Sequence, residues 1–438
     1  MNHFADHIRR KTHRRDQFIE WIKGLLAVPF VLASKPAAVY DDRKDKNLAN
    51  MATSAHQRYA DIFRDIEALV LDHIKHQDSA NPRSKLIMLV PTVSKFFTPL
   101  DLVEAFEVQD SIRAISSRRF VPPSFNDIRL ILNTSQILHL MRGPSGPGLQ
   151  LLTFDGDVTL YEDGGSLLAD EKDGTLPPIV HHLLYFLSRS VKIGIVTAAG
   201  HGEKEAHKYY ARLSGLLDAV ASSQTLTPKQ KSGLIIMGGE SNFLFVFDQD
   251  AACKLRYIHR RDWILPVMHN WEESAIKSLL NAAEVAFNDC VKTLHLTGAA
   301  VLRKERAVGI YVDKAKPEKL KLNREQLEET VLVVQQILEA YSEGVVESQK
   351  SPLIPWTVFN GGSDVFMDIG DKSLGVQSCQ KWFGGIKPAN TLHIGDQFLS
   401  GGGNDFKARD ACCTSWIASP LETSSLLEMM IELGEKNG

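Results

Sequence analysis

Asp155 and Asp157 follow directly on an apolar segment, residues 149–154, in which only Gln150 is neither apolar nor β-branched. A short apolar run of this kind is typical of a parallel strand that is covered on both faces. In an open α/β sheet, ligands bind at the carboxyl ends of the strands, which is where these aspartates lie. Two carboxylates this close repel each other unless a cation lies between them, so the pair indicates a cation site. The alternative is an ordinary turn, because Asp-Gly is a common turn pair.

Other polar residues also lie at the ends of predicted strands. One strand ends near Thr197, whose hydroxyl and neighbouring backbone N–H groups suit a phosphate oxygen, although threonine is common in strands for other reasons. Another strand ends at Asp396, and the glycine-rich loop after it leads to Asn404 and Asp405, which form a plausible rim of a cation site. Between these strands in the sequence, Lys372 lies immediately before a predicted helix.

The elements that must position these residues fall into three parts. Residues 1–145 carry little strand signal, and apolar side chains spaced three and four apart predict helices at 55–76 and 126–141. The glycine- and proline-rich segment 143–148 is the clearest linker of the chain. A mostly helical module ahead of a catalytic domain is most often regulatory or oligomerising, and we expect one of these roles here.

The remaining sequence predicts an α/β core with an inserted α/β unit. We assign residues 146–204 and 361–438 to the core, which contains the strands described above. The segment 205–360 combines further strand patterns with patterns of long helices and predicts a unit with its own core. Its predicted strands are 233–238, 242–247, 254–259 and 308–312, and its predicted long helices are 271–294 and 323–341.

Composition excludes several classes of protein. The chain has 438 residues, which is too long for one compact core. Its net charge of −3 provides no basic field of the kind that nucleic-acid binding needs. Its five cysteines form no Cys-x-x-Cys pair, which favours a reducing compartment and argues against a structural zinc site.

One segment near the start deserves comparison with targeting signals. The apolar run at residues 24–33 spans only about ten residues, which is too short to cross a bilayer. The basic segment before it could imitate a signal peptide, but the apolar spacing over 18–26 favours an amphipathic helix. We therefore expect a cytoplasmic protein that does not bind membranes.

The strand-end residues occur in a characteristic order. Asp-x-Asp-x-Thr lies at 155–159, followed by Thr197, Lys372, Gly-Asp at 395–396 and Asn-Asp at 404–405. In type and order these elements resemble the four motifs of the haloacid dehalogenase phosphatase superfamily. The resemblance implies a Rossmann-like parallel-sheet core. Because the inserted unit lies between the second and third motifs, it also implies the larger, type 2 form of cap domain.

Longer phrases resemble one family more closely. They are Arg-Phe-Val-Pro-Pro-Ser at 119–124, Thr-Phe-Asp-Gly-Asp-Val-Thr-Leu-Tyr at 153–161, His-Ile-Gly-Asp-Gln-Phe at 393–398 and Asn-Asp-Phe-Lys-Ala-Arg at 404–409. These phrases look like the IMP-specific 5′-nucleotidase family, and the resemblance covers nearly the whole chain. It implies Mg²⁺ as cofactor, IMP as substrate, inosine and phosphate as products, allosteric activation by ATP and a homotetramer.

The resemblance also implies roles for the central residues. Asp155 attacks phosphorus and forms an aspartyl-phosphate. Asp157 protonates the leaving ribose 5′-oxygen and later accepts a proton from the attacking water. Asp155, the main-chain carbonyl of Asp157 and Asp396 hold Mg²⁺. Thr197 and Lys372 hold the transferring phosphoryl group.

Further residues are expected around this centre. Asn404 and Asp405 orient Asp396, its water ligands or the lysine. Asp163 and Asp364 contact the ribose or the base, although each could equally be a turn or cap residue. For ATP, the candidates are basic residues near loops of the helical module, namely Lys95, Arg118, Arg119 and Arg142.

Two other functions fit parts of the pattern. A sugar phosphatase or phosphomutase could use the same core and cap, and the acid at Asp157 favours these reactions over dehalogenase-like chemistry. A non-catalytic nucleotide sensor is the alternative of a different class. It is disfavoured because a sensor has no need of the complete set of nucleophile, acid, hydroxyl, lysine and metal ligand.

Overall fold

The computed structural model describes residues 16–33, 44–79, 83–118, 120–142, 148–170, 174–312, 322–347, 353–399 and 402–437. These residues form two compact units. The first unit contains the described residues up to Leu149, together with Cys412–Trp416 and the described residues from Met429 onward. The second unit contains those of Gln150–Ala411 and Ile417–Glu428.

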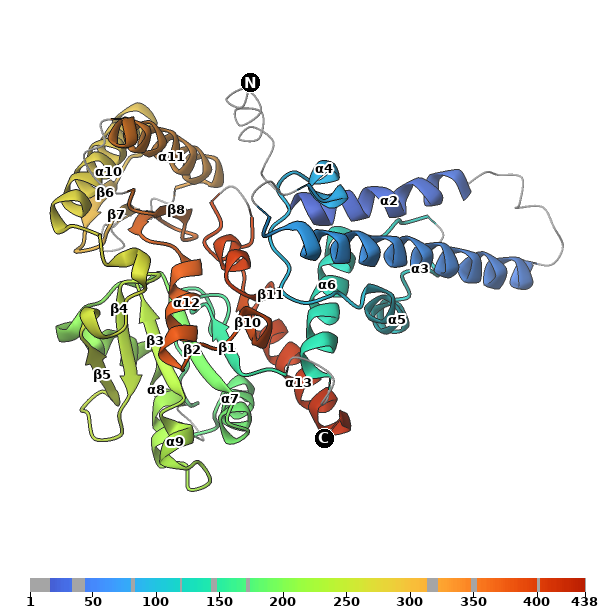
Figure 1. Cartoon of the computed structure of the whole chain (residues 1–438), viewed down its shortest axis with the longest axis horizontal. Helices are drawn as coiled ribbons and strands as arrows, with labels where there is room; N and C mark the ends of the chain where they lie inside the picture. The colour runs from blue at the N-terminus through green and yellow to red at the C-terminus, as the bar shows by residue number, and fades with distance from the viewer. Residues whose placement is uncertain are drawn as a thin grey trace. The chain divides into compact units, whose positions relative to one another are not determined.

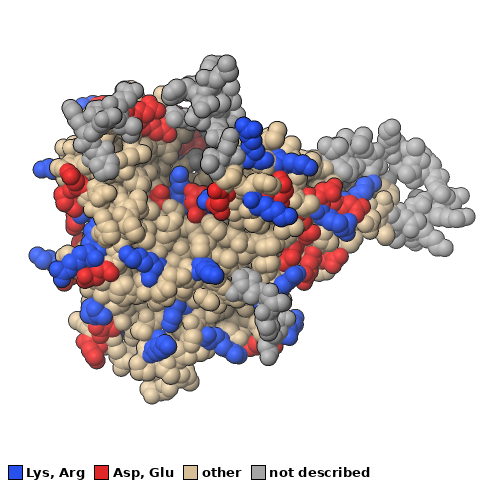
Figure 2. All heavy atoms as spheres, viewed as in Figure 1, with Lys and Arg blue, Asp and Glu red and all other residues tan. Residues whose placement is uncertain are grey.

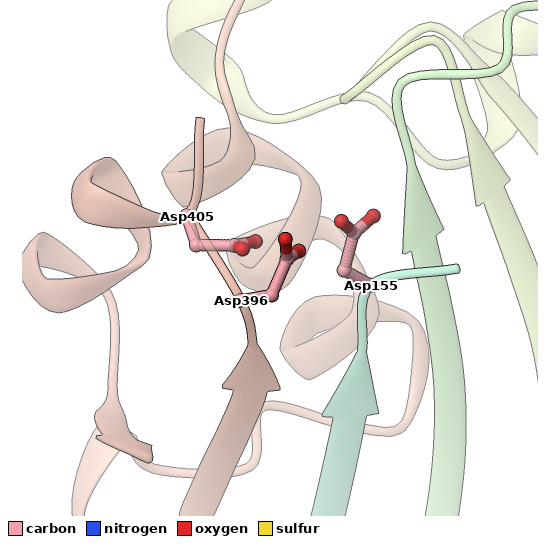
Figure 3. Close-up of side chains that lie close together, drawn as sticks. All are labelled: Asp155, Asp396 and Asp405. Atoms are coloured by element: carbon pink, nitrogen blue, oxygen red, sulfur yellow. The ribbon is translucent and has the colours of Figure 1, made fainter. Parts of the chain in front are cut away.

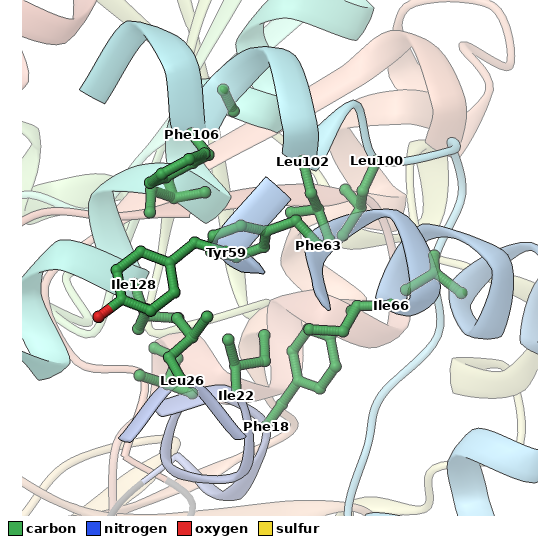
Figure 4. Packing of buried hydrophobic residues seen from close by; sticks show 14 of the residues in the cluster. Phe18, Ile22, Leu26, Tyr59, Phe63, Ile66, Leu100, Leu102, Phe106 and Ile128 are labelled. Carbon is green, nitrogen blue, oxygen red and sulfur yellow. The ribbon is translucent and has the colours of Figure 1, made fainter. Parts of the chain in front are cut away.

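The first unit is built mainly from helices. They are α2 (Gln17–Ala33), α3 (Lys44–His76), α4 (Lys85–Leu89), α5 (Leu102–Arg113) and α6 (Phe125–Met141). The helices predicted at 55–76 and 126–141 lie within α3 and α6. The apolar faces meet in one core, in which Phe18, Phe63 and Phe106 come from three different helices (Figure 4). The rings of Phe63 and Phe106 stack with 5.3 Å between their centroids.

A buried carboxylate fixes the start of α6. Ser124 Oγ accepts a hydrogen bond from the Asp127 N–H, and the Asp127 carboxylate accepts one from the Ser124 N–H, which is a capping box. The same carboxylate receives Arg113 Nε at 2.8 Å and Arg118 Nη1 at 2.6 Å. Burial alone would raise the pKa of Asp127, but the hydrogen bonds from Arg118, Ser124 and Arg113 lower it well below its ordinary value.

Replacement of Asp127 by Ala is expected to lower the free energy of unfolding by about 2–4 kcal/mol, because the helix loses its cap and two arginines lose their shared partner. Urea unfolding followed by circular dichroism measures the loss. The stabilisation is present above the ordinary pKa of 3.8 and disappears as the pH falls toward the lower pKa of the folded state. The wild-type and variant unfolding curves should therefore converge in acid.

Asp61→Ala is the control for this prediction. It removes an ion pair with Arg64 in which both side chains are more than half exposed (58% and 53%). We expect the free energy of unfolding to change by at most about 1 kcal/mol, because exposed ion pairs contribute little to stability. Equal losses in the two variants would contradict a special role for Asp127.

A seven-stranded sheet carries the strand-end residues. Its order is β11-β10-β1-β2-β3-β4-β5, and every strand except β11 lies in the second unit (Figure 1). The strands are β1 (Leu151–Phe154), β2 (Lys192–Thr197), β3 (Leu234–Gly238), β4 (Phe243–Phe247), β5 (Leu255–Ile258), β10 (Thr391–Gly395) and β11 (Cys413–Trp416). β10, β1, β2 and β3 pair in parallel, whereas β4 runs antiparallel to both of its neighbours, β3 and β5. The residues that follow the parallel strands therefore share one edge of the sheet.

Several helices accompany this sheet. They are α7 (Pro178–Ser188), α8 (Ala206–Ser222), α9 (Pro228–Lys231), α12 (Lys372–Trp382) and α13 (Pro420–Asn437). Short 3-10 helices are η2 (Glu203–Glu205), η3 (Arg260–Asp262), η4 (Pro266–Met268), η5 (Pro388–Asn390) and η6 (Asp405–Asp410). All residues of β1, β3, β4 and β10 are buried, as expected for a sheet that is covered on both faces.

A second, four-stranded sheet has the order β6-β7-β9-β8 and is antiparallel throughout. Its strands are β6 (Ala299–Arg303), β7 (Ala307–Val312), β8 (Trp356–Asn360) and β9 (Val365–Ile369). The long helices α10 (Glu273–Thr293) and α11 (Arg324–Glu347) pack against it (Figure 1). This sheet and its helices form the inserted α/β layer of the second unit.

The sheets do not follow the boundaries expected at residues 204 and 361. The predicted strands between 233 and 259 were assigned to the inserted unit, but as β3, β4 and β5 they extend the core sheet. Conversely, β9 lies beyond residue 361 and yet pairs with β7. Buried apolar strands look alike in sequence, so the apolar pattern identified the strands but did not indicate which sheet each strand joins.

Three further features of the described residues concern their apolar helices, their thiols and their surface charges. None of the helices in these ranges has both the length and the apolar character that a membrane-crossing segment requires. All five cysteines are described, and all are free thiols. On the face drawn in Figure 2, Lys and Arg side chains are intermingled with Asp and Glu side chains.

Candidate active site

Asp155 is the first residue after β1, and it continues the pairing of the strand because its N–H donates to the carbonyl of Ile394 (3.0 Å). The residue is buried, with 6% of its surface exposed. The next residue has to be small, since a Cβ atom on Gly156 would lie 2.7 Å from Tyr161 Oη and 3.4 Å from Thr197 Oγ1. The glycine thus lets the loop after β1 pass close to the end of β2.

Asp157 lies in a different environment from Asp155. It is half-buried, and its Oδ1 accepts a hydrogen bond from the Gly164 N–H (3.1 Å). Arg212 Nη1 lies 4.0 Å from the same oxygen, and its guanidinium covers the ring of Tyr161. One aspartate of the pair is therefore enclosed at the end of the strand, and the other lies within reach of solvent.

Lys372, the first residue of α12, supplies a buried positive charge. Its Nζ lies 2.9 Å from Asp155 Oδ1 and 2.5 Å from Asp405 Oδ1, and its side chain is fully buried. Burial alone would lower the pKa of Lys372, but the charges of Asp155, Asp405 and Glu240 together raise it above its ordinary value. The lysine is therefore a permanent cation that contacts two carboxylates.

Asp405 receives several donors besides the lysine. His393 Nε2 lies 3.0 Å from its Oδ1, and the Gln397 N–H donates to its Oδ2 (2.8 Å). Because Nε2 faces a carboxylate, it is the nitrogen that donates, which leaves Nδ1 to accept the Thr153 hydroxyl (3.0 Å), and burial lowers the pKa of the ring. Burial would raise the pKa of Asp405, but Lys372 and His393 hold it well below its ordinary value.

Three carboxylates meet at the end of β1 and β10. Asp155, Asp396 and Asp405 each offer an oxygen, and these oxygens all lie within 4.8 Å of one another (Figure 3). Burial, followed by the charge of Asp405, raises the pKa of Asp155 to about 7 even though Lys372 opposes the shift. Burial and the charges of Asp405 and Asp155 raise the pKa of Asp396 to about 8.

These carboxylates fit a hard divalent cation. Their oxygens are the ligand type that Mg²⁺ prefers. The raised pKa values of Asp155 and Asp396 reflect burial first and like charges second, and a bound cation would favour the ionised form of both groups. The predicted ligands Asp155 and Asp396 are thus brought together, and Asp405, expected only as a supporting residue, lies within the same cluster.

Thr197 ends β2 beside this cluster. It is buried, and its Oγ1 accepts a hydrogen bond from the Ala199 N–H (3.1 Å). Because that oxygen also lies next to Gly156, the hydroxyl stands beside the loop that carries the two aspartates. The structure therefore places Thr197 at the same edge as Asp155, as parallel pairing of β1 and β2 predicts.

Asp163 and Asp364 come from different layers and lie near one turn. Asp163 is exposed, whereas Asp364 is half-buried in the turn between β8 and β9. A Cβ atom on Gly362 would lie 3.6 Å from Asp163 Oδ2, so this turn of the second sheet approaches the loop after β1. The Asp364 carbonyl closes the turn by accepting the Gly361 N–H (3.0 Å).

Asn404 has a partner that the sequence did not predict. Its Nδ2 donates to Glu240 Oε1 (3.0 Å), in the loop after β3. Burial raises the pKa of Glu240 well above its ordinary value.

In β9, burial likewise raises the pKa of Asp368 to about 7, although Lys304 opposes the shift. Sequence inspection missed Glu240 and Asp368, because no strand-end pattern of the predicted core marks them.

The basic residues selected for ATP lie in the first unit. Lys95 pairs with Asp78 (2.7 Å), and Arg118 pairs with Asp127. Arg142 lies 2.8 Å from Glu104 and also pairs with Asp101. Arg119 lies outside the described residues. Three of the four candidates therefore already neutralise carboxylates of the same unit.

One edge of the parallel sheet carries an aspartate pair, a hydroxyl, a buried lysine and an acidic cluster, which together define a site suited to phosphoryl transfer. Sequence comparison specifies the family. The chain belongs to the IMP-specific 5′-nucleotidase family, whose sequence model matches residues 5–427. It is accordingly a hydrolase that acts on a phosphate monoester.

Relatives from fungi match over almost their whole length. IMP-specific 5′-nucleotidase 1 of Neurospora crassa is 54% identical over 434 residues, which cover 97% of this chain and 96% of the relative. The Saccharomyces cerevisiae protein of the same name is 44% identical over 459 residues, which cover 96% of this chain and 97% of the relative. The family assignment therefore includes the helical unit as well as the catalytic one.

Solved structures of Plasmodium falciparum IMP-nucleotidase share the fold. A form with IMP bound superposes with a TM-score of 0.76 at 28% identity, covering 96% of this chain and 94% of that one. A form with ATP bound has a TM-score of 0.73 at 28% identity, covering all of this chain (100%) and 89% of that one.

Proposed function

We propose that this protein is a Mg²⁺-dependent phosphatase that hydrolyses IMP to inosine and phosphate through an aspartyl-phosphate on Asp155. The observation that carries the proposal is the position of Asp155, buried at the end of β1 with Lys372 Nζ 2.9 Å from its carboxylate. The IMP-bound Plasmodium relative supports the choice of substrate.

In the first step Asp155 attacks phosphorus, and the bond from phosphorus to the ribose 5′-oxygen breaks. Asp157 donates the proton that the leaving oxygen needs. In the second step Asp157 takes a proton from water, which attacks the aspartyl-phosphate and releases phosphate. The solvent-accessible position of Asp157 suits this exchange with water, whereas the enclosed Asp155 suits a nucleophile whose charge is poorly solvated.

Asp155, Asp396 and the main-chain carbonyl of Asp157 would hold Mg²⁺. When bound, the ion supplies positive charge that offsets the charge of the phosphoryl oxygens and of the nucleophile. Asp405 lies in the same acidic cluster, and we assign it to orienting Lys372, which it contacts at 2.5 Å. Thr197 and Lys372 hold the phosphoryl group, the threonine through its hydroxyl and the lysine as a point charge.

The second sheet acts as the cap that selects the substrate. Its β8–β9 turn approaches the loop after β1, so Asp364 of the cap and Asp163 of the core border the same space. We assign both residues to contacts with the ribose or the base. Asp155 and Asp157 provide the part of the substrate site that faces the phosphate.

Asp157→Asn is expected to slow phosphate release from IMP by about 10²–10⁴-fold, because the leaving oxygen loses its proton donor. The effect on p-nitrophenyl phosphate should be much smaller in the first step, since nitrophenolate leaves without a proton. A burst of nitrophenol followed by slow turnover is the expected record in a stopped-flow experiment. Equal slowing of the first step for both substrates would contradict the acid role.

Substrate choice is tested by a panel. Phosphate release from IMP, AMP, GMP and hexose 6-phosphates should be measured with and without ATP. We expect IMP to be the preferred substrate and ATP to raise its turnover, in keeping with the ATP-bound relative. Hydrolysis of hexose 6-phosphates without hydrolysis of IMP would favour a sugar phosphatase instead.

The remaining assignments concern the whole protein. We assign ATP binding to the helical unit and retain Lys95, Arg118, Arg119 and Arg142 as candidates. Charge-removal variants test them by the loss of activation by ATP at unchanged basal activity.

We propose a cytoplasmic homotetramer. Free cysteines are compatible with a reducing compartment, and light scattering coupled to gel filtration measures the subunit number.

A further inference from the structure

The loop after β3 touches several parts of the site. Glu240 in this loop is fully buried and has a φ of 61°, a left-handed conformation that costs energy for a residue other than glycine. Its N–H donates to the Thr197 carbonyl (2.9 Å). A Cβ atom on Gly375 would lie only 2.1 Å from the Glu240 carbonyl oxygen, so α12, which begins with Lys372, packs directly on this backbone.

The side chain of Glu240 reaches a third part of the site. Asn404 Nδ2 donates to Glu240 Oε1 at 3.0 Å, which uses one half of each planar group. The other halves are Glu240 Oε2 and Asn404 Oδ1, and both oxygens are buried without a hydrogen-bond partner among the described residues. Two acceptors cannot satisfy each other, and buried polar atoms of this kind are rare in folded proteins.

A single hydrogen would satisfy both oxygens. If Oε2 carries a proton, it can donate to Asn404 Oδ1 while Oε1 accepts from Asn404 Nδ2. The two planar groups would then form a pair with two parallel hydrogen bonds. A carboxylate leaves the Asn404 oxygen unpaired and places one more buried negative charge beside Asp155 and Asp405.

We propose that Glu240 is a neutral carboxylic acid whose pair with Asn404 makes it a positioning residue for Thr197 and Lys372. The charge balance of the site favours this form, because Lys372 already faces Asp155 and Asp405, and a third anion would weaken its attraction for a phosphoryl group. Burial and the charges of Asp368, Asp155 and Asp405 raise the pKa of Glu240 against the effect of Lys372, which agrees with the neutral form.

Paired substitutions separate the neutral acid from a carboxylate. Gln in place of Glu240 has the same shape, cannot ionise, and can both accept from and donate to Asn404. Glu240→Gln should therefore retain kcat/KM for IMP within about threefold, whereas Glu240→Leu should lose about 10–100-fold, as is typical for removal of a supporting contact. Glu203→Gln, at an exposed site, is the control for loss of a glutamate charge.

The readouts distinguish positioning from general destabilisation. Inorganic phosphate should inhibit Glu240→Leu about tenfold more weakly than wild type, because Thr197 and Lys372 shift, and a variant that is only less stable would keep the wild-type inhibition constant. Asn404→Leu should lose kcat/KM for IMP to the same extent as Glu240→Leu, and the double variant should lose no more than either single variant. A loss in Glu240→Gln as large as in Glu240→Leu, with both proteins folded, would overturn the proposal.

Infrared spectroscopy tests the protonation state without any substrate. At neutral pH the carbonyl band of protonated carboxylic acids should be stronger in the wild type than in Glu240→Gln, so the difference spectrum between them should contain one such band, which should shift in D₂O. Absence of this band from the difference spectrum would overturn the proposal. The kinetic test rests on the proposed function, but the spectrum does not, so a wrong substrate and a wrong protonation state give different results.

Discussion

Asp155→Asn is expected to reduce phosphate release from IMP by a factor on the order of 10⁴ or more, because an amide cannot form the phosphoryl intermediate. The fold should survive, since Asn has nearly the same shape and Lys372 keeps Asp405 as a partner. Steady-state phosphate release measures the loss, and calorimetry measures IMP binding to the variant. We expect binding to persist while turnover is lost.

Asp250→Asn is the matched control for this substitution. Asp250 is exposed in the turn between β4 and β5, so the same chemical change should leave turnover within about twofold of wild type. Mass spectrometry of enzyme quenched in acid should detect one phosphoryl group on the wild type and none on Asp155→Asn. Wild-type turnover in Asp155→Asn would show that the nucleophile has been assigned wrongly.

Lys372→Met should produce the largest change in stability. The substitution removes the ammonium group that contacts both Asp155 and Asp405, and it leaves buried carboxylates without their cation. Breaking a buried ion pair from one side typically costs about 3–5 kcal/mol, so the free energy of unfolding should fall by that amount. Urea unfolding in the absence of divalent cations measures the loss, and phosphate release should also be lost.

Lys381→Met tests the same helix at an exposed position. Lys381 lies in the last turn of α12, and its ammonium donates to the Ile264 carbonyl. We expect the free energy of unfolding to fall by at most about 1 kcal/mol, as for a single surface hydrogen bond. If Lys372→Met were no more destabilising than Lys381→Met, the buried charge network would contribute nothing to folding.

The meeting of the strand-end residues was predictable because its cause is simple. Parallel strands end at one edge, so an aspartate after β1 and another after β10 were expected at the same edge of the sheet, and the pairing of β1 with β10 makes them neighbours. Asp155 and Asp396 illustrate this rule. The same rule places Thr197 beside them at the end of β2.

The contacts of side chains that cross between layers were not predictable in this way. Apolar alternation in β3–β5 and in β6–β9 is similar, so the strands could not be assigned to their sheets before their pairing was known. Glu240 reaches the site only because β3 joins the core sheet, and its bond to Asn404 spans 164 residues of sequence. The role of His393 was not predictable for another reason. The sequence around a histidine inside an apolar strand does not indicate a distant partner such as Asp405.

The helical unit is closed by residues from the far end of the sequence. Arg129 and Asn133 of α6 bond the Trp416 carbonyl, Asn133 Oδ1 accepts the Trp416 N–H (3.0 Å), and the rings of Phe125 and Trp416 meet edge to face. During translation, α6 is synthesised long before Trp416, so its polar groups gain these partners only at a late stage. A fragment that ended within residues 143–148, the linker predicted from the sequence, would lack these partners, and such long-range closure is a source of slow folding and aggregation during synthesis.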